Sequence, residues 1–432
     1  MPTIRDVLSL FRPIPDDATD WRAMRDARLR RTVVEAAVHC PFYREWLNSH
    51  RIVPTEIRSA EDVLQIPVLT RGQVRAEGQR MVREDVPVDT CSREMTSGTT
   101  GEPTTLYTRS SELRVQHALW LSGYLRAGLR PWHRQAKFIM AHRIPEKPRP
   151  YQRVGILRRA YFPTAAPTVE KLDWLRRLRP DALFSWGSLL SELANQLEQE
   201  QDELNIPLIV STSDKLQREL VAARIKGRLL DVYGSIETGP VAWGCGVAEG
   251  YHIDPRWVHV ELVAEDGQPA RRGTVVCTPM WRRIMPLIRY QLGDIAEWAD
   301  TPCPCGNPLP RIRSLIGRHG ELLSLPNGVR LSANVVAEAV RQVPGIQAFQ
   351  FAQRSETESV LFLVPGPEMP SNAVARVRDL LTERLGAGVQ VQVKCVPALY
   401  RAPDVKFRAS YPLVMIERLR CAGVDVERIL AQ

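Results

Sequence analysis

The stretch TSGTTGEPTT at residues 96–105 says more about the fold than any other part of the chain. Hydroxyl side chains flank two glycines in it, Gly98 and Gly101, whose backbone N–H groups are not shielded by a side chain. A loop of this kind offers N–H and O–H donors to a polyphosphate. It lacks the Lys-Ser or Lys-Thr ending of a P-loop NTPase, because Glu102 follows Gly101. By itself, a run of Gly, Ser and Thr is more often a polar surface turn.

Length and composition indicate an ordinary globular protein of two or three domains. The chain has 432 residues, of which 44% are hydrophobic and 25% charged. No apolar run reaches the roughly 18 residues that span a bilayer. Arg5 and Asp6 interrupt the N-terminus before the apolar core of a signal peptide. Eight scattered cysteines make no disulfide framework, so we expect a cytoplasmic protein without a membrane partner.

The net charge of +9 admits three interpretations. One is a nucleic-acid partner, another is a surface that attracts small polyanions such as ATP or coenzyme A, and the third is a solvated basic face with no partner. The densest basic patch spans residues 143–159. No basic tail and no basic stripe interleaved with aromatic residues is visible, so we expect no nucleic-acid partner.

Between residues 110 and 235, short apolar runs alternate with helical patterns. The expected helices cover residues 111–127, 168–178, 187–203 and 214–226, and the expected strands cover residues 136–140, 182–185, 208–211 and 229–233. This alternation predicts βαβ units and a largely parallel sheet. Ligands of such sheets bind beyond the C-terminal ends of the strands. Upstream, residues 20–50 are expected to be helical with a break near Pro41, and residues 106–108 to form a strand that holds the 96–105 loop taut.

The pattern becomes β-like after residue 256. Strands are expected at residues 258–263 and 274–278, in a small barrel or meander, and the last hundred residues resemble a separate α+β unit. We therefore predict an α/β protein. A large N-terminal domain, residues 1–316, would hold mostly parallel sheets flanked by helices plus a small β subdomain. A small α+β C-terminal domain, residues 317–432, would move about a hinge near Gly317.

Three further stretches carry groups that a nucleotide needs. DVYGSIETG at residues 231–239 ends a strand in a glycine turn and presents an aromatic ring with the carboxylate of Glu237, which suits Mg²⁺ beside phosphate. Asp294 follows a glycine, where a carboxylate can accept from both hydroxyls of a ribose. Lys406 is one of 58 Lys and Arg residues and gains interest only from its context. Taken singly, each is more often a turn or surface residue.

A separate set of residues could hold a metal ion. Cys245, His252, Cys303 and Cys305 supply three thiolates and one imidazole, the donors of a closed, structural zinc site. The spacing is not that of a standard zinc finger, and four unrelated residues are the alternative. His259 is a spare candidate ligand.

Taken in order, these stretches resemble the motifs of adenylate-forming enzymes of the acyl-CoA synthetase superfamily, in its phenylacetate–CoA ligase-like branch. Residues 96–105 resemble the phosphate loop of that family, residues 233–237 its aromatic–Gly–x–x–Glu motif, and Asp294 its ribose-binding aspartate. Gly317 and Arg318 resemble the hinge, and Lys406 the catalytic lysine of the C-terminal domain. The pieces at residues 41–43 and 66–70 are similar to the N-terminal region of the branch, and the Cys and His positions also have counterparts in it.

The sequence departs from the family pattern in three places. Glu102 stands where the phosphate loop usually has a lysine, so one cation is missing. Residues 319–321, His-Gly-Glu, replace an acidic hinge pair. Gln291 and Leu292 stand where an Arg-Thr pair is usual, which puts the details of the ribose contact in doubt.

The resemblance implies an ATP- and Mg²⁺-dependent, AMP-forming ligase that activates a carboxylic acid, preferably aromatic, and passes the acyl group to coenzyme A. Transfer to an amine or another nitrogen nucleophile, or to a carrier protein, is the alternative, and a non-catalytic nucleotide- or nucleic-acid-binding protein is a distant one. A homodimer is compatible with it. An apolar pocket for the acid is expected from Phe184, Trp186, Tyr233 and Trp243.

The residues implied fall into three groups. The catalytic group is Lys406, Glu237 and Thr99, the nucleotide-binding group is Thr96, Ser97, Gly98, Thr100, Gly101, Ser213, Asp231, Tyr233, Gly234, Ser235, Asp294 and Arg318, and the zinc group is Cys245, His252, Cys303 and Cys305.

Overall fold

The computed structural model describes residue 11 and residues 18–95, 104–212, 216–318, 322–326, 328–400, 410–421 and 423–431. Several predicted site residues lie outside these ranges, and nothing further is said of their structure: Thr96, Ser97, Gly98, Thr99, Thr100, Gly101, Ser213 and Lys406.

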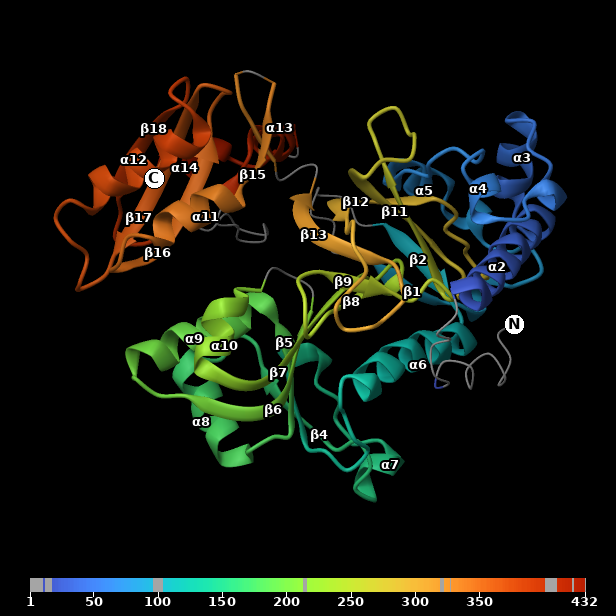
Figure 1. The fold of residues 1–432 in the computed structure, drawn as a ribbon, viewed down its shortest axis with the longest axis horizontal. Helices are drawn as coiled ribbons and strands as arrows, with labels where there is room; N and C mark the ends of the chain where they lie inside the picture. The colour runs from blue at the N-terminus through green and yellow to red at the C-terminus, as the bar shows by residue number, and fades with distance from the viewer. Residues whose placement is uncertain are drawn as a thin grey trace.

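An 11-stranded sheet in the order β10-β11-β12-β13-β9-β8-β7-β6-β5-β3-β4 forms the centre of the large part of the molecule (Figure 1). Its strands are β3 (Gln135–Ile139), β4 (Arg159–Pro163), β5 (Ala182–Trp186), β6 (Leu204–Thr212), β7 (Ile225–Ser235), β8 (Gly239–Gly244), β9 (Tyr251–Ile253), β10 (Val258–Val263), β11 (Arg272–Pro279), β12 (Tyr290–Trp298) and β13 (Arg311–Arg318). Strands β3 to β7 are parallel, and every pairing from β7 to β10 is antiparallel. The parallel half confirms the βαβ prediction.

Helices cover both faces of the parallel half. On one face, α8 (Thr168–Leu178), α9 (Gly187–Gln199) and α10 (Arg218–Arg224) enclose a core that includes Leu183 and Ile209. On the other face, α6 (Ser110–Arg126) packs over Phe184 and Val210. Because successive strand residues point to opposite faces, Leu183 and Phe184 mark the two sides of one sheet.

Helix α6 approaches the sheet closely at one glycine. A Cβ atom at Gly123 would lie 2.1 Å from the ring of Trp243 on β8, so only glycine allows this contact. The close approach seats the Trp243 ring against the helix and fixes the height of α6 above the sheet.

The N-terminal segment packs on the antiparallel half. It contains α2 (Ala18–His39), α3 (Pro41–Ser49), α4 (Ala60–Val63) and α5 (Arg71–Glu77), together with the short turns η1 (Pro54–Glu56), η2 (Gly78–Met81) and η3 (Val88–Thr90). Pro41 begins a new helix, which confirms the expected break. The buried Tyr43 hydroxyl donates to the carbonyl of Pro286 at 2.8 Å and accepts from the N–H of Ile288 at 3.1 Å. These bonds tie α3 to the segment that precedes β12.

A hairpin holds the two ends of the 96–103 segment together. Strand β1 (Ser92–Met95) pairs antiparallel with β2 (Thr105–Thr108), with Met95 opposite Thr105. The strands on either side of the loop therefore hold its ends taut, as the sequence predicts.

The C-terminal residues form a separate α+β unit, with its own two cores (Figure 1). Its sheet has the order β18-β17-β16-β19. The strands are β16 (Ile346–Gln353), β17 (Glu358–Pro365), β18 (Gln390–Cys395) and β19 (Ser410–Tyr411), and the helices are α11 (Asn334–Arg341), α12 (Ala373–Leu385), α13 (Leu413–Cys421) and α14 (Val426–Ala431). The hairpin of β14 (Leu322–Ser324) and β15 (Arg330–Ser332) precedes it.

The fold class matches the prediction, with differences in detail. The predicted helix at 187–203 ends at Gln199, and strands β4, β8, β9, β12, β13 and β17 and helices α13 and α14 were not predicted. The predicted β subdomain is hydrogen-bonded through β9 into the same sheet as the parallel strands. Over the described ranges, no helix combines the length and apolar character needed to cross a membrane.

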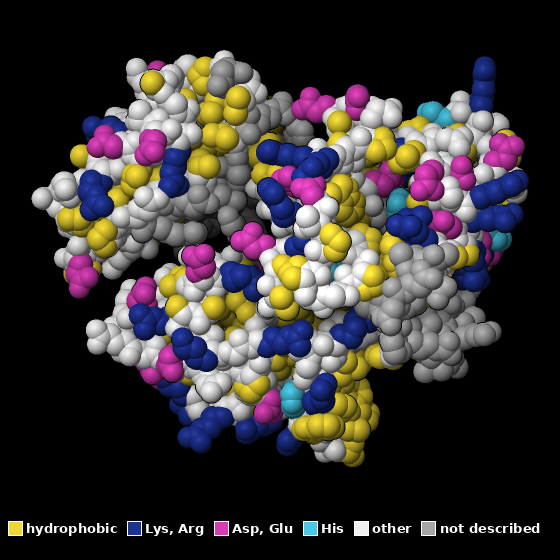
Figure 2. All heavy atoms as spheres, in the orientation of Figure 1, with side chains coloured by type: hydrophobic (Ala, Val, Ile, Leu, Met, Phe, Trp, Pro, Cys, Tyr) yellow, Lys and Arg dark blue, Asp and Glu magenta, His cyan; other side chains and the backbone are white. Residues whose placement is uncertain are grey.

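Charged side chains are distributed over the visible surface, as Figure 2 shows. Lys and Arg side chains lie beside a hydrophobic patch over the short helix α7 (Pro150–Arg153), at the β3–β4 edge of the sheet. The 3₁₀ turn η4 (Ala141–Arg143) follows β3 at the same edge.

Candidate active site

The β7–β8 hairpin brings two predicted site residues to its tip. Gly234 lies where the strands almost touch, because a Cβ atom there would be 2.5 Å from the carbonyl oxygen of Gly239. The Ser235 hydroxyl accepts from the N–H of Thr238 at 3.2 Å, which closes the turn. Gly234 and Ser235 thus shape the tip that carries Tyr233 and Glu237.

Tyr233 is bonded to the predicted ribose-binding carboxylate. Its hydroxyl donates to Asp294 Oδ2 at 2.8 Å. In the β12–β13 pairing the backbone of Asp294 lies opposite that of Arg318. Three residues that the sequence named from separate motifs, Tyr233, Asp294 and Arg318, therefore meet at one place.

Glu237 is buried and paired with a cation that the sequence did not predict. The carboxylate is 4% exposed, and its Oε1 accepts from Arg71 Nη2 at 2.8 Å. Arg71 Nε also donates to the Tyr290 hydroxyl at 3.4 Å, and that hydroxyl lies 3.5 Å from Glu237 Oε1. Burial, and then the negative charge of Glu237, raise the pKa of Tyr290 to about 12, so Tyr290 stays a neutral donor.

Arg71 reaches this place through a pairing distant in sequence. Leu69 forms a parallel β-bridge to Tyr290. Its N–H donates to the backbone carbonyl of Arg289, and its carbonyl accepts from the backbone N–H of Gln291, both at 2.9 Å. Thr70 then caps α5, so Arg71 is the first residue of the helix. Residues 66–70 resemble an N-terminal segment of the ligase family, but that resemblance predicted no role for Arg71.

A second unpredicted arginine lies beneath the β1–β2 hairpin. Arg282 is fully buried, and both Nη atoms donate to the Thr108 hydroxyl at 3.3 Å. Burial lowers its pKa, while the negative fields of Glu112, Glu94 and Glu237 oppose that shift. The surroundings of Glu237 therefore contain two guanidinium groups, although the lysine usual at position 102 is absent.

Asp231 is bonded to another strand of the sheet. Its Oδ2 accepts from the Tyr251 hydroxyl at 2.5 Å. Burial raises the pKa of Asp231 above its ordinary value of 3.8, and the Tyr251 hydrogen bond opposes part of this rise. The carboxylate fixes β7 against β9.

The four predicted metal ligands converge. The Sγ atoms of Cys245, Cys303 and Cys305 and a ring nitrogen of His252 all lie within 4.8 Å of one another. Cys245 Sγ is 3.5 Å from Cys303 Sγ, and Cys305 Sγ is 3.4 Å from His252 Nε2. A tetrahedral zinc ion with bonds of about 2.3 Å to sulfur separates its sulfur ligands by about 3.8 Å. The donor set and its spacing therefore fit a zinc ion.

The surroundings of the four ligands favour a thiolate at Cys245. Burial would raise the pKa of Cys245, but N–H groups of Ala248 and Val247, with His252 and Cys303, lower it to about 6. His252 Nδ1 lies 3.4 Å from the carbonyl of Leu309, which directs Nε2 at the thiols. His259, the spare candidate, is not part of the cluster: it is buried beside Glu261, with Nε2 3.7 Å from the carboxylate.

The aromatic residues expected to line one acid pocket divide among three clusters. Phe184 and Trp243 share a cluster with Tyr124 between them, at ring distances of 4.9 and 5.7 Å. Trp186 packs on the core of the opposite sheet face, and Tyr233 packs against the N-terminal core. The prediction of one four-residue pocket is therefore wrong, and the α6 face retains two of its members.

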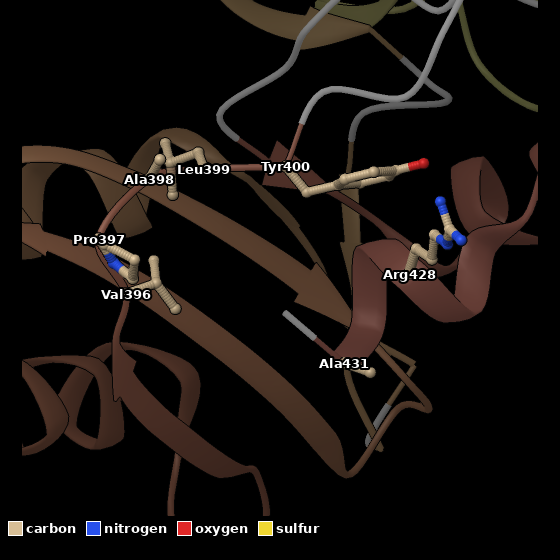
Figure 3. Close-up of a pocket in the computed structure, with 7 residues that line it drawn as sticks. All are labelled: Val396, Pro397, Ala398, Leu399, Tyr400, Arg428 and Ala431. Carbon is tan, nitrogen blue, oxygen red and sulfur yellow. The ribbon is translucent and has the colours of Figure 1, made fainter.

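A cavity of about 530 Å³ lies in the C-terminal unit, between the chain after β18 and helix α14 (Figure 3). Its lining is mostly apolar, with the ring of Tyr400 and the guanidinium of Arg428 on one side. None of the predicted site residues that the structure describes lines it, and we assign it no role in the candidate site.

The chain resembles known proteins in both sequence and fold. No protein-family model matches the chain. The phenylacetate-coenzyme A ligase of Thermus thermophilus is 25% identical over 346 residues, covering 75% of this chain and 76% of that protein, and the enzyme of the same name from Aromatoleum evansii is 23% identical over 369 residues with the same coverage.

Solved structures of 2-hydroxyisobutyryl-CoA ligase share the fold. The complex with R3-HIB-AMP in the postadenylation state has a TM-score of 0.74 at 20% identity, covering 94% of this chain and 93% of that one. The complex with 2-HIB-AMP and CoA in the thioesterification state has a TM-score of 0.60 at 20% identity, covering 94% and 92%. The arrangement of the present chain is thus more similar to the former state.

We expect Asp231→Asn to stabilise the protein at neutral pH. The folded-state pKa of this carboxyl is raised, so the folded protein holds the proton more tightly than the unfolded chain, and stability falls as pH rises from 3.8 to the raised pKa. Asparagine keeps an oxygen for Tyr251 but avoids the buried charge. Urea unfolding at pH 7 should show a gain on the order of 1 kcal/mol, shrinking towards pH 4. Asp266→Asn, in an exposed turn, is the control; equal curves for both variants would contradict the prediction.

Proposed function

We propose that the chain, which is similar to phenylacetate-coenzyme A ligases, is an adenylate-forming enzyme that activates a carboxylic acid with Mg·ATP and transfers the acyl group to coenzyme A. The observation that carries the proposal is the meeting of Tyr233 with Asp294 beside the Glu237–Arg71 pair. An aromatic ring, a ribose-type carboxylate and a carboxylate suited to Mg²⁺ then surround one nucleotide.

The nucleoside would bind at Tyr233 and Asp294. The phenol ring offers a face on which a base can stack, and the Asp294 carboxylate can accept from two vicinal hydroxyls. The Tyr233–Asp294 hydrogen bond holds both groups in position before the nucleotide arrives, which lowers the entropy cost of binding. Arg318 stands opposite Asp294, and Asp231 keeps β7 in place through Tyr251.

The phosphates would lie between the hairpin tip and residues 96–101. By resemblance, Thr96, Ser97, Gly98, Thr100 and Gly101 cradle them, with Thr99 at the reacting end and Ser213 at the rim of β6. Glu237 would hold Mg²⁺, which neutralises phosphate charge when bound.

The chemical step joins two anions, so its main requirement is positive charge. The acid's carboxylate oxygen attacks the α-phosphorus, the bond to the β-phosphate oxygen breaks, and pyrophosphate leaves. Arg71, paired with Glu237 here, would be available to phosphate oxygens if Glu237 held Mg²⁺, and the buried guanidinium of Arg282 would add positive field. These two guanidiniums take over the charge of the lysine missing at position 102. Lys406 would reach the α-phosphate from the C-terminal domain, residues 317–432, which then rotates to admit the acyl acceptor.

The proposal predicts acid-dependent ATP–pyrophosphate exchange. Lys406→Ala should lower the exchange rate about 100-fold or more, because one preorganised charge at the reacting phosphate is lost. Lys226→Ala is the matched control, since Lys226 is an exposed lysine on β7 paired only with surface groups. An undiminished rate for Lys406→Ala would remove that residue from the mechanism, and no exchange with any acid in the unaltered enzyme would refute the adenylation itself.

The acyl acceptor is tested by the mass of the product. With ATP, a panel of aryl acids and coenzyme A, we expect an acyl thioester and AMP in equal amounts. Parallel reactions with amines and with a carrier protein test the alternatives. AMP release that requires an amine and yields an amide would replace coenzyme A as the acceptor while leaving the adenylation intact.

We also propose that Cys245, His252, Cys303 and Cys305 bind one structural zinc ion. Four protein ligands leave no open position, so the ion would pin the β8–β9 hairpin to the β12–β13 loop rather than take part in the reaction. None of the eight cysteines forms a disulfide, and we propose a cytoplasmic location.

Purified protein should therefore contain about one zinc ion per chain. Elemental analysis by plasma mass spectrometry should show that Cys303→Ser loses most of it and lowers the melting temperature by several degrees, since metal binding contributes folding free energy. Cys395→Ser, an exposed cysteine on β18, is the control. Protein prepared with zinc in the medium that holds no metal, and melts like the Cys303→Ser variant, would contradict the site.

A further inference from the structure

Most of the chain's net charge comes from one short segment. Residues 130–159 contain nine Lys and Arg residues and one acidic residue, Glu146, so they carry +8 of the total +9. The segment forms β3, η4, α7 and the start of β4, at the edge of the parallel half of the sheet. Most of these cations are exposed, but Lys137 and Arg159 are partly buried beneath α6.

Lys137 points to the α6 face of the sheet. Its strand neighbours Ala136 and Phe138 pack into the core on the opposite face, so residues 135 and 137 face α6. In the register of the sheet, Lys137 lies beside Phe184 on β5 and Tyr161 on β4. The ammonium group is therefore placed among aromatic side chains, not in open solvent.

The hydrogen-bond donors at this place outnumber the acceptors. Arg159 Nε donates to Gln135 Oε1 at 2.9 Å, which uses the one acceptor of that side chain. Gln135 is 1% exposed, and its Nε2 has no partner in the described part of the chain. Lys137 likewise forms no ion pair or side-chain hydrogen bond with a described residue. A buried donor left without an acceptor costs about 1–3 kcal/mol, so this grouping indicates a missing acceptor.

The charged groups around Lys137 all have the same sign. Burial lowers the pKa of Lys137, and Arg159 lowers it further. The pKa of His117 on α6 is lowered by burial and then by the positive charges of Arg149, Arg159 and Lys137. No carboxylate contributes to either shift, so the described residues leave the charge of the cluster uncompensated.

A row of aromatic rings lies on the same face of the sheet as this cluster and ends beside β7, the strand that carries Tyr233 on its opposite face. Trp243 lies opposite Val232, the residue before Tyr233. From Trp243 the row continues to Tyr124 at 5.7 Å and to Phe184 at 4.9 Å, and Phe184 is the register neighbour of Lys137. From Trp243 on β8 to Phe184 on β5 the row crosses three strand spacings, or about 14 Å, and Lys137 on β3 lies one strand further. That span exceeds a single substituted ring and suits an extended acid.

We propose that Lys137, with Gln135 and Arg159, binds a second anionic group at the far end of the acid, so that the substrate is an extended aromatic acid with two anionic groups, such as a dicarboxylate. The inference rests on the proposed adenylating function and adds the class of acid. Lys137 is then a residue that determines specificity, and the α6 face is the wall along which the acid lies.

The test compares pairs of aryl acids that differ only in a second carboxylate at the remote end, by ATP–pyrophosphate exchange without coenzyme A. The unaltered enzyme should prefer the dianionic member at least tenfold in kcat/KM. Lys137→Met should lower kcat/KM for the dianionic acids by about 10- to 100-fold, as expected for one charged hydrogen bond. The loss should lie mainly in KM, with the monoanionic acids unaffected. Lys137→Arg should keep the preference, and Lys226→Met, at an exposed ion-paired lysine, should match the unaltered enzyme.

The outcomes separate the inference from the function beneath it. The inference is overturned if the unaltered enzyme shows exchange with aryl acids but no preference for the second carboxylate. It is also overturned if Lys137→Met keeps the same preference. Both outcomes leave the proposed adenylation intact. No exchange with any acid overturns both. A coenzyme A phosphate is the other source of an anion. The inference would also be overturned if Lys137→Met raised the KM for coenzyme A but left the KM for dephospho-coenzyme A and the acid selectivity unchanged. If Lys137→Met does not fold, Lys137→Gln replaces it, with the same expectations.

Discussion

The curl of the central sheet is the constraint on which the candidate site depends. Strands β7 and β12 are four positions apart in the hydrogen-bonded order, which in a flat sheet would separate them by about 19 Å. Yet the Tyr233 hydroxyl on β7 donates to Asp294 on β12 at 2.8 Å. The antiparallel half must therefore bend back towards the parallel half. Register shifts between Tyr233 and Gly234 and between Ile295 and Ala296 supply the irregularities at which a sheet can bend.

Buried ion pairs hold the N-terminal segment against this curled half. Arg289, in the left-handed backbone region with φ of 51°, pairs with Glu261 and donates to the carbonyls of Leu64 and Ile66. A buried charge is tolerated only when it is paired and hydrogen-bonded, and this arginine meets both conditions. Next to these contacts, Leu69 forms a β-bridge with Tyr290, and Arg71, two residues later, pairs with Glu237. The N-terminal segment thus supplies one of the two guanidinium groups near Glu237.

The sequence predicts the parts of this arrangement that depend on local pattern. Alternating apolar runs predict the parallel half, and the glycines at 234 and 239 fit the hairpin they form. The Cys and His residues were predicted as a set by their chemistry, and they meet because Arg311 on β13 pairs with His252 on β9. The positions of Arg71, Arg282 and Tyr290 were not predictable. Their roles arise from pairings across 53 to 219 residues, such as Arg71 with Glu237, and no local pattern records such a contact.

The two halves of the sheet divide the proposed work in a way that follows from their shapes. The curled half contains the Tyr233–Asp294 bond, the Arg289–Glu261 pair and the four-ligand cluster, so under the proposed function a change there would disturb nucleotide binding and stability together. In the parallel half, the Trp243, Tyr124 and Phe184 rings pack in a row on the α6 face. A substitution on β3 or β4 therefore alters what lies under α6 without moving the nucleotide end. Under the proposed function, the fold would then change the acid it accepts at that edge while leaving the adenylating groups in place.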